Sequence, residues 1–135
     1  MNVSFRDKLQ VSSSILETIG DTPLVQLKQI PSNSKIEVFA KLESFNPSGS
    51  VKARTSYNIL QKAIESGELK KGDTVIESSS GNMAIGLAQA CLVFGLKLIV
   101  VVDPKINKIT SQLLETYGAT IEMVTEPLKE GGFLG

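Results

Sequence analysis

The stretch with the clearest chemical potential covers residues 46–54 and reads Asn-Pro-Ser-Gly-Ser-Val-Lys-Ala-Arg. Its proline and small residues predict a turn, Gly49 is expected to take a positive φ, and Ser50 is expected to cap a following helix. Lys52 would then lie in the first helical turn, where the positive end of the helix dipole disfavours its ammonium form. A neutral amine attacks carbonyl groups, so Lys52 is a candidate covalent anchor for a carbonyl-bearing cofactor or substrate. The alternative is a solvated surface lysine.

A second candidate loop, residues 78–82, reads Ser-Ser-Ser-Gly-Asn and stands between a predicted strand and a predicted helix. Hydroxyl groups, successive backbone N–H groups and a helix N-terminus together suit a carboxylate or a phosphate. The alternative is an ordinary turn in which a serine caps the helix. Glycine here does not follow the spacing of a P-loop or of a dinucleotide fingerprint, which argues against nucleoside phosphates.

The elements that would position both loops alternate between strand and helix. Apolar periodicity, β-branched residues and glycine stops predict strands at 24–27, 36–42, 74–76, 98–102 and 119–124, and helices at 83–94, at 107–117 and from Lys52 to a stop at Gly67. Strand 74–76 should be buried, strand 98–102 should be covered on both faces, and helix 83–94 should lie between layers. The pattern predicts an α/β fold, with an open parallel sheet and flanking helices in three layers.

Composition excludes several classes of function. The 135 residues are 41% apolar with a net charge of zero, so neither nucleic acid nor a membrane is an expected partner. No apolar run is long enough to span a bilayer, and residues 1–10 lack a signal-peptide core, so the expected location is cytoplasmic. Without histidine, neither a histidine triad nor an ordinary zinc site is expected, and Cys91, the only cysteine, should be a buried packing thiol.

Taken together, three motifs resemble the cysteine synthase family, which comprises pyridoxal-phosphate enzymes of fold type II. They are residues 18–25 (Thr-Ile-Gly-Asp-Thr-Pro-Leu-Val), residues 46–52 described above, and residues 77–82 (Glu-Ser-Ser-Ser-Gly-Asn). Within the family, residues 102–105 (Val-Asp-Pro-Lys) and 122–127 (Glu-Met-Val-Thr-Glu-Pro) are most similar to the synthases that join O-phosphoserine to glutamate in siderophore and antibiotic pathways. The resemblance runs from about residue 15 to the last residue.

The resemblance implies a role for each motif. Lys52 would hold pyridoxal 5'-phosphate through a Schiff base and move the Cα proton, and Asn82 would hydrogen-bond the ring hydroxyl of the cofactor. The substrate carboxylate would be bound by Ser79, Ser80 and nearby backbone amides, at a site that also includes Gly81 and Met83. The implied reaction is β-replacement, in which a leaving group departs from an activated serine and a nucleophile takes its place.

Three departures from the family pattern bear on these roles. Met83 stands where typical cysteine synthases have a threonine, which argues against plain cysteine synthesis. Ala53 replaces an aspartate that would close a capping box with Ser50, so the loop presenting Lys52 is expected to be looser. Family members run to about twice this length or more, in two domains, and the missing half would hold the phosphate-binding loop and the residue facing the pyridine nitrogen.

The predicted organisation follows from that comparison of lengths. Residues 1–44 would form an N-terminal arm and strands that normally pack on the absent larger domain, and residues 45–135 a truncated smaller domain carrying the lysine. Apolar surface around Leu24, Val25 and Leu27 would then be exposed or covered by another chain, for example in a homodimer.

The sequence therefore predicts part of a pyridoxal-phosphate-dependent β-replacing amino-acid synthase, a transferase that is inactive as an isolated chain. Its substrates would be an activated serine, such as O-phosphoserine or O-acetylserine, and a nucleophile such as glutamate or sulfide. One alternative is a parent that is a β-eliminating serine or threonine dehydratase or a threonine synthase. The other is a non-catalytic α/β module that binds a partner subunit.

Overall fold

The computed structural model describes residues 11–30, 33 and 35–126. Most of the expected N-terminal arm, and the last residues of the expected truncated domain, lie outside the described residues. Along the chain the elements are η1 (Ile15–Thr18), β1 (Leu24–Gln26), β2 (Phe39–Lys41), η2 (Glu43–Phe45), α2 (Lys52–Glu65), β3 (Thr74–Ser78), α3 (Asn82–Phe94), β4 (Lys97–Val102), α4 (Lys108–Thr116) and β5 (Thr120–Met123).

The main sheet is parallel, and its strand order is β3-β4-β5. Ile76 pairs with Ile99, and Val100 pairs with Ile121. Parallel neighbours need a crossover between them, and α3 and α4 supply the two crossovers. The α/β class and the open parallel sheet with flanking helices are confirmed.

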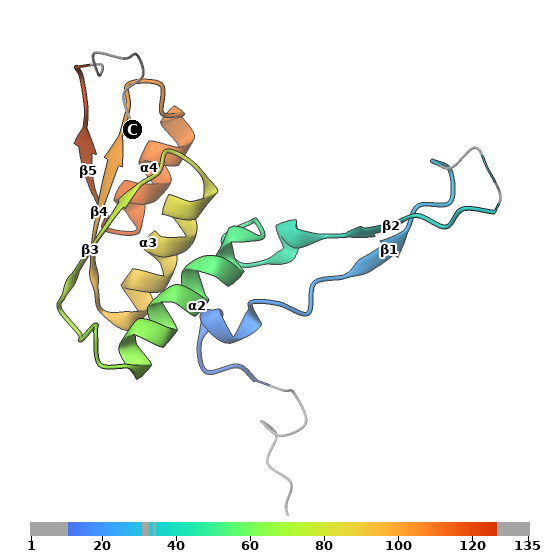
Figure 1. Cartoon of the computed structure of the whole chain (residues 1–135), viewed down its shortest axis with the longest axis horizontal. Coiled ribbons are helices and arrows are strands. Elements are labelled where there is room, and N and C mark those ends of the chain that lie inside the picture. The colour runs from blue at the N-terminus through green and yellow to red at the C-terminus, as the bar shows by residue number, and fades with distance from the viewer. Residues whose placement is uncertain (1–10, 31–32, 34, 127–135) are drawn as a thin grey trace, which may run out of the picture.

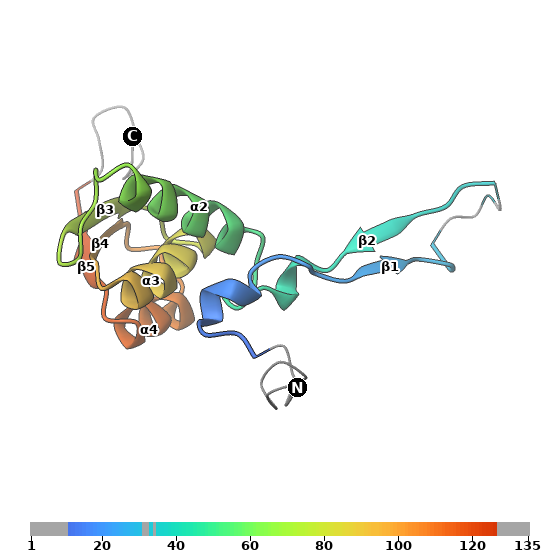
Figure 2. The same ribbon diagram turned by 90° about the horizontal axis from the view of Figure 1, so that it is seen from below.

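The helices lie on one side of this sheet in both views of the chain (Figures 1 and 2). Along β4, Leu98, Val100 and Val102 are buried, whereas the residues between them are partly exposed. The prediction that this strand is covered on both faces is therefore wrong for the described residues, because an unbroken apolar run does not show how many faces are packed. Strand β3 was predicted to be buried, but it is an edge strand, and 66% of Ile76 is exposed.

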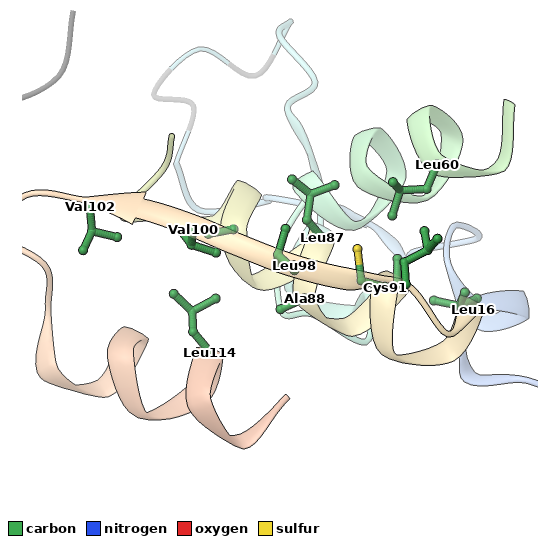
Figure 3. Packing of buried hydrophobic residues seen from close by; sticks show 12 residues of the cluster. Leu16, Leu60, Leu87, Ala88, Cys91, Leu98, Val100, Val102 and Leu114 are labelled. Atoms are coloured by element: carbon green, nitrogen blue, oxygen red, sulfur yellow. The ribbon is translucent and has the colours of Figure 1, made fainter. Parts of the chain in front are cut away.

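The core lies where α3 meets β4 and the neighbouring helices (Figure 3). Leu114 of α4 points toward Val100, and Cys91 of α3 lies near Leu60 of α2 and Leu16 of η1. Burying one large aliphatic side chain contributes about 1.5 to 3 kcal/mol. Because α3 has neighbours on several sides, it is buried from Ala84 to Cys91 almost without interruption, as its apolar sequence predicted.

Helices α2 and α3 cross at unusually small residues. A Cβ atom added to Gly86 would lie 2.5 Å from Ser56 Oγ and 3.1 Å from the carbonyl oxygen of Lys52. Ser56 is fully buried, and its hydroxyl donates a hydrogen bond to the Met83 carbonyl oxygen at 3.4 Å. This close approach places the N-terminal turns of the two helices side by side.

The two-stranded antiparallel hairpin β1–β2 extends away from the helices and the main sheet (Figures 1 and 2). Each strand has three residues, fewer than the sequence predicted. The expected exposure of apolar surface is found at Leu24, which is 63% exposed, and at Val25, whereas Leu27 is half-buried. Phe39 on the opposite strand is 52% exposed as well.

Candidate functional site

Lys52 is the first residue of α2, as the turn before it predicted. Gly49 has a φ of 76°, and its N–H donates to the Asn46 carbonyl oxygen at 2.7 Å. The hydroxyl of Ser50 accepts a hydrogen bond from the Lys52 N–H at 3.2 Å, although the residue directly before the helix is Val51. The Lys52 side chain is exposed, and no partner for its amine lies within the described part of the chain.

The turn that presents Lys52 is held by a carboxylate that the sequence did not single out. Glu43 Oε2 accepts hydrogen bonds from Arg54 Nε and from Asn46 Nδ2, each at 2.8 Å. Glu43 Oε1 accepts from Arg54 Nη2 at 3.0 Å and from the Thr22 hydroxyl at 2.8 Å. The loop before Lys52 lacks a capping-box acid at Ala53, and Glu43, which lies outside the helix, holds it instead.

Further bonds join this cluster to the residues before the hairpin. The Gly20 N–H donates to Asn46 Oδ1 at 3.0 Å, and Arg54 Nη2 donates to the Thr22 hydroxyl at 3.2 Å. Asn46 and Thr22 are almost fully buried, at 3% and 5% exposed. The hydrogen bond from Arg54, reinforced by those from Thr22 and Asn46, lowers the pKa of the Glu43 carboxyl to about 2.

The loop of residues 78–82 leads from the carboxyl end of β3 into α3, which begins at Asn82. Ser79 and Ser80 are half-buried, and Asn82 is exposed. The Ser79 hydroxyl accepts from the Gly81 N–H at 3.4 Å. Gly81 directly precedes the helix in an extended conformation, and among the described residues no side chain caps α3, so the alternative of a serine-capped helix is not found.

The structure brings some of the predicted site residues together and turns one away. Lys52 and Asn82 are the first residues of two helices that contact each other within their first five residues, at Lys52 and Gly86 and at Ser56 and Met83. The Met83 sulfur instead lies 3.5 Å from Ser56 Oγ on α2, so its thioether packs between the helices. Cys91 is buried as predicted, and burial raises the pKa of its thiol to about 11.

Other features of the described residues lie elsewhere. A cavity of about 430 Å³ is lined by Thr74, Lys97 and Thr120, the first residues of the three parallel strands. It therefore lies at the amino ends of the strands, whereas Ser78 stands at a carboxyl end. Residues 11–30, 33 and 35–126 contain no group of three acidic or cysteine side chains placed to hold a metal ion. Within the same ranges, no helix is long and apolar enough to cross a lipid bilayer.

Comparison with known proteins agrees with this arrangement. The family model described as "Pyridoxal-phosphate dependent enzyme" matches residues 15–133. The chain belongs to this family. The family uses pyridoxal phosphate, and it includes the cysteine synthases that the three motifs resemble.

Several similar proteins are synthases of amino acids. Over 124 residues, the chain is 47% identical to an N-(2-amino-2-carboxyethyl)-L-glutamate synthase of Ralstonia nicotianae and 49% identical to one of Cupriavidus metallidurans. These alignments cover 92% of this chain but only 37% and 36% of the relatives. The solved cysteine synthase of Entamoeba histolytica matches with a TM-score of 0.82 and 36% identity, over 97% of this chain and 39% of that one. The chain therefore spans little more than a third of the length of the curated relatives it matches.

Proposed function

We propose that this chain is part of a pyridoxal-phosphate-dependent β-replacing amino-acid synthase and that Lys52 is the covalent anchor of the cofactor. The observation that carries the proposal is the contact between the first five residues of α2 and of α3, which begin at Lys52 and Asn82. An exposed amine and an exposed amide then stand at the ends of two adjacent helices.

The residues present fit the carbonyl side of the cofactor. The Lys52 amine has no partner among the described residues and can form the covalent link. Asn82 would accept or donate a hydrogen bond at the ring hydroxyl beside that link. When bound, the cofactor supplies an electron sink for bond changes at the substrate Cα and Cβ.

The uncapped N-terminus of α3 would bind the substrate carboxylate. Backbone N–H groups at a helix start attract anions, and the hydroxyls of Ser79 and Ser80 precede this helix by two or three residues. Gly81 leaves the approach open, because a Cβ atom there would meet nothing within 4 Å. Met83 would contribute through its backbone, since its side chain packs against Ser56.

Once the amino group of the substrate has displaced Lys52 from the cofactor, the freed lysine amine would also move the proton at the substrate Cα. A carboxylate fixed at the start of α3 orients the Cα–H bond of the substrate, and the neighbouring helix start brings the amine to it. Proton removal at Cα allows the leaving group to depart from Cβ, and a nucleophile then bonds to Cβ. Lys52 returns the proton to Cα at the end of the cycle.

The names of the relatives suggest the substrate class. We propose an activated serine such as O-phosphoserine or O-acetylserine, with an amine nucleophile such as glutamate and sulfide as the other candidate. A cytoplasmic role in siderophore biosynthesis, and the division into residues 1–44 and a smaller domain of residues 45–135, belong to this proposal and rest on the motif resemblance.

The test of the anchor is reduction of the purified chain with borohydride in the presence of pyridoxal phosphate, followed by peptide mass spectrometry. We expect the pyridoxyl group on Lys52 and none at that position in Lys52→Ala. Lys62→Ala is the matched control, because Lys62 is an exposed lysine on the same helix, and it should retain the Lys52 adduct. Adducts spread evenly over surface lysines would contradict the proposal.

The protruding hairpin favours a second role as an association surface between copies of the chain, through residues such as Leu24 and Phe39. Leu24→Ser should lower the mass measured by sedimentation equilibrium. Ile109→Ser is the matched control, because Ile109 is similarly exposed but lies on α4, and it should leave the mass unchanged. A monomeric wild-type chain would exclude this role.

A further inference from the structure

The Glu43 side chain binds residues at both ends of the segment that carries Lys52. Asn46 stands six residues before Lys52 and Arg54 two residues after it, and both donate to Oε2 of Glu43 at 2.8 Å. A single carboxylate oxygen therefore closes the turn on both sides of the lysine. The second oxygen, Oε1, completes a bidentate pair with Arg54.

Inside this closure the backbone is fixed by short-range bonds. The Gly49 N–H donates to the Asn46 carbonyl oxygen, and the Ser50 hydroxyl accepts from the Lys52 N–H. The Lys52 carbonyl oxygen itself lies against Gly86 of α3. The lysine backbone is thus restrained by α3 directly and by the Glu43 carboxylate through Asn46 and Arg54.

We propose that Glu43 is a positioning residue for Lys52, acting through Asn46 and Arg54 to fix where the amine stands relative to the start of α3. The inference rests on the proposed role of Lys52 as the anchor. If the carboxylate is removed, Asn46 and Arg54 lose their shared acceptor, and the turn between them gains conformational entropy. That entropy has to be lost again whenever Lys52 reacts, because the reaction needs the amine in one position.

A simpler role for the same contacts is to attach the hairpin to the rest of the molecule. Thr22 separates the two roles, because its hydroxyl joins Glu43 and Arg54 from the hairpin side but does not close the turn. Thr22→Val keeps the size of this buried side chain and removes its hydrogen bonds. If positioning is the role, Glu43→Gln should affect Lys52 more than Thr22→Val does.

The experiment uses two measurements on the full chain that need no cofactor. Amide hydrogen exchange followed by mass spectrometry reports the protection of residues 46–54 and, as a reference, of α3. Competitive labelling with acetic anhydride over a range of pH reports the reactivity of Lys52 relative to Lys62. Borohydride reduction with pyridoxal phosphate, as above, is the third and separate measurement.

For Glu43→Gln we expect exchange in residues 46–54 to rise about tenfold, the effect of losing one charge-assisted hydrogen bond. The Lys52-to-Lys62 labelling ratio should change, and α3 should keep its wild-type protection. Arg54→Lys, which keeps the charge but loses the planar fork, should give a smaller change in the same direction. If Glu43→Gln fails to fold, this second variant decides the question by the same measurements.

Wild-type exchange in residues 46–54 together with an unchanged labelling ratio in both variants would overturn the inference. So would an equal effect of Thr22→Val. Failure of the anchor proposal can be told apart from failure of the positioning role. If pyridoxal phosphate shows no selectivity for Lys52 in the wild-type chain, the anchor proposal fails, and hydrogen exchange and acetylation still decide the positioning role. If Lys52 is selected equally in wild type and Glu43→Gln, with unchanged exchange, the anchor stands and the positioning role is excluded.

Discussion

The N-termini of α2 and α3 are adjacent in space but are built in opposite ways. At α2 the hydroxyl of Ser50 bonds the Lys52 N–H, and Glu43 ties down the residues on both sides. At α3 the preceding residue is Gly81, and within the described residues no side chain bonds the first N–H groups of the helix. Polar groups are satisfied within the chain at the helix start that carries the proposed anchor, and N–H donors stay available at the helix start where an anion is proposed to bind.

A third helix shows that the open end of α3 is not the rule in this molecule. Helix α4 begins after Asn107, whose side-chain oxygen accepts from the Ile109 N–H at 2.8 Å. A capping side chain is therefore present at a helix start to which no ligand is assigned. Among the described residues, α3 lacks such a capping side chain, and α3 follows the loop that the motif resemblance links to the substrate carboxylate.

The largest expected effect comes from forcing the two N-termini apart with Gly86→Ala. The added methyl group would meet Ser56 Oγ and the Lys52 carbonyl oxygen, so α2 has to shift. Overpacking costs about 1 to 3 kcal/mol, more than the roughly 1 kcal/mol that alanine gains over glycine in a helix. We expect a lower free energy of unfolding in urea and fewer pyridoxyl adducts on Lys52.

The matched variant for this prediction is Gly86→Ala combined with Ser56→Gly, which removes the nearest atom that the methyl group would meet. Part of the lost adduct should return, even though glycine lowers helix stability. Equal adduct yields in Gly86→Ala and wild type would show that the spacing of the two helix starts does not matter for Lys52.

Removing the cap of α4 should have the next largest effect, and only on stability. Asn107→Ala loses the bond to the Ile109 N–H and should cost about 1 kcal/mol in urea unfolding. Lys52 labelling should stay at the wild-type level, because α4 does not carry the site. A change in labelling would mean that the helix starts are coupled through the core rather than through the α2–α3 contact.

A smaller effect is expected from acid, because Glu43 and Arg54 are partly exposed and water screens the pair. The pKa of Glu43 is lowered from 4.5 to about 2, so the native state stabilises the ionised carboxylate. This contribution is fully present above pH 4.5 and is lost as the pH falls toward about 2. In urea unfolding over this range, Glu43→Gln should lose less stability than wild type. Parallel curves for the two proteins would contradict the assignment.

The smallest expected effect comes from giving α3 the cap that it lacks. Gly81→Asp places a capping carboxylate where a Cβ atom has free space, and it should raise the free energy of unfolding by a few tenths of a kcal/mol. The same carboxylate would occupy the donors proposed for the substrate. A loss of stability would show that this helix start is not free to accept a side-chain partner.

Local chemistry explains which parts of this structure could be predicted from the sequence. Apolar periodicity located α2, α3 and α4, and Gly95, with a φ of 69°, ends α3 where its position predicted. Lys52 was found because a turn and a helix start are encoded by adjacent residues. Glu43 was missed because its contacts reach Arg54 eleven residues away and Thr22 twenty-one residues away, and no local pattern marks such pairs.

The faces of the sheet were mispredicted for a related reason. Alternating burial in β4 depends on which side the helices occupy, yet Leu98 and Ile99 are equally apolar. Strand β3 lies at an edge, a position that is set by the order of the strands and not by its own residues. Such properties belong to the arrangement of distant segments, which hydrophobic periodicity does not describe.

The tight crossing at Gly86 also has an evolutionary consequence. Because the space for one methyl group is taken by Ser56, a larger residue at position 86 requires a smaller one at position 56. The two positions are therefore expected to vary together among relatives that keep this crossing, with serine or alanine facing glycine and glycine facing alanine. A lineage that changed one without the other would be expected to show compensating change at the start of α2.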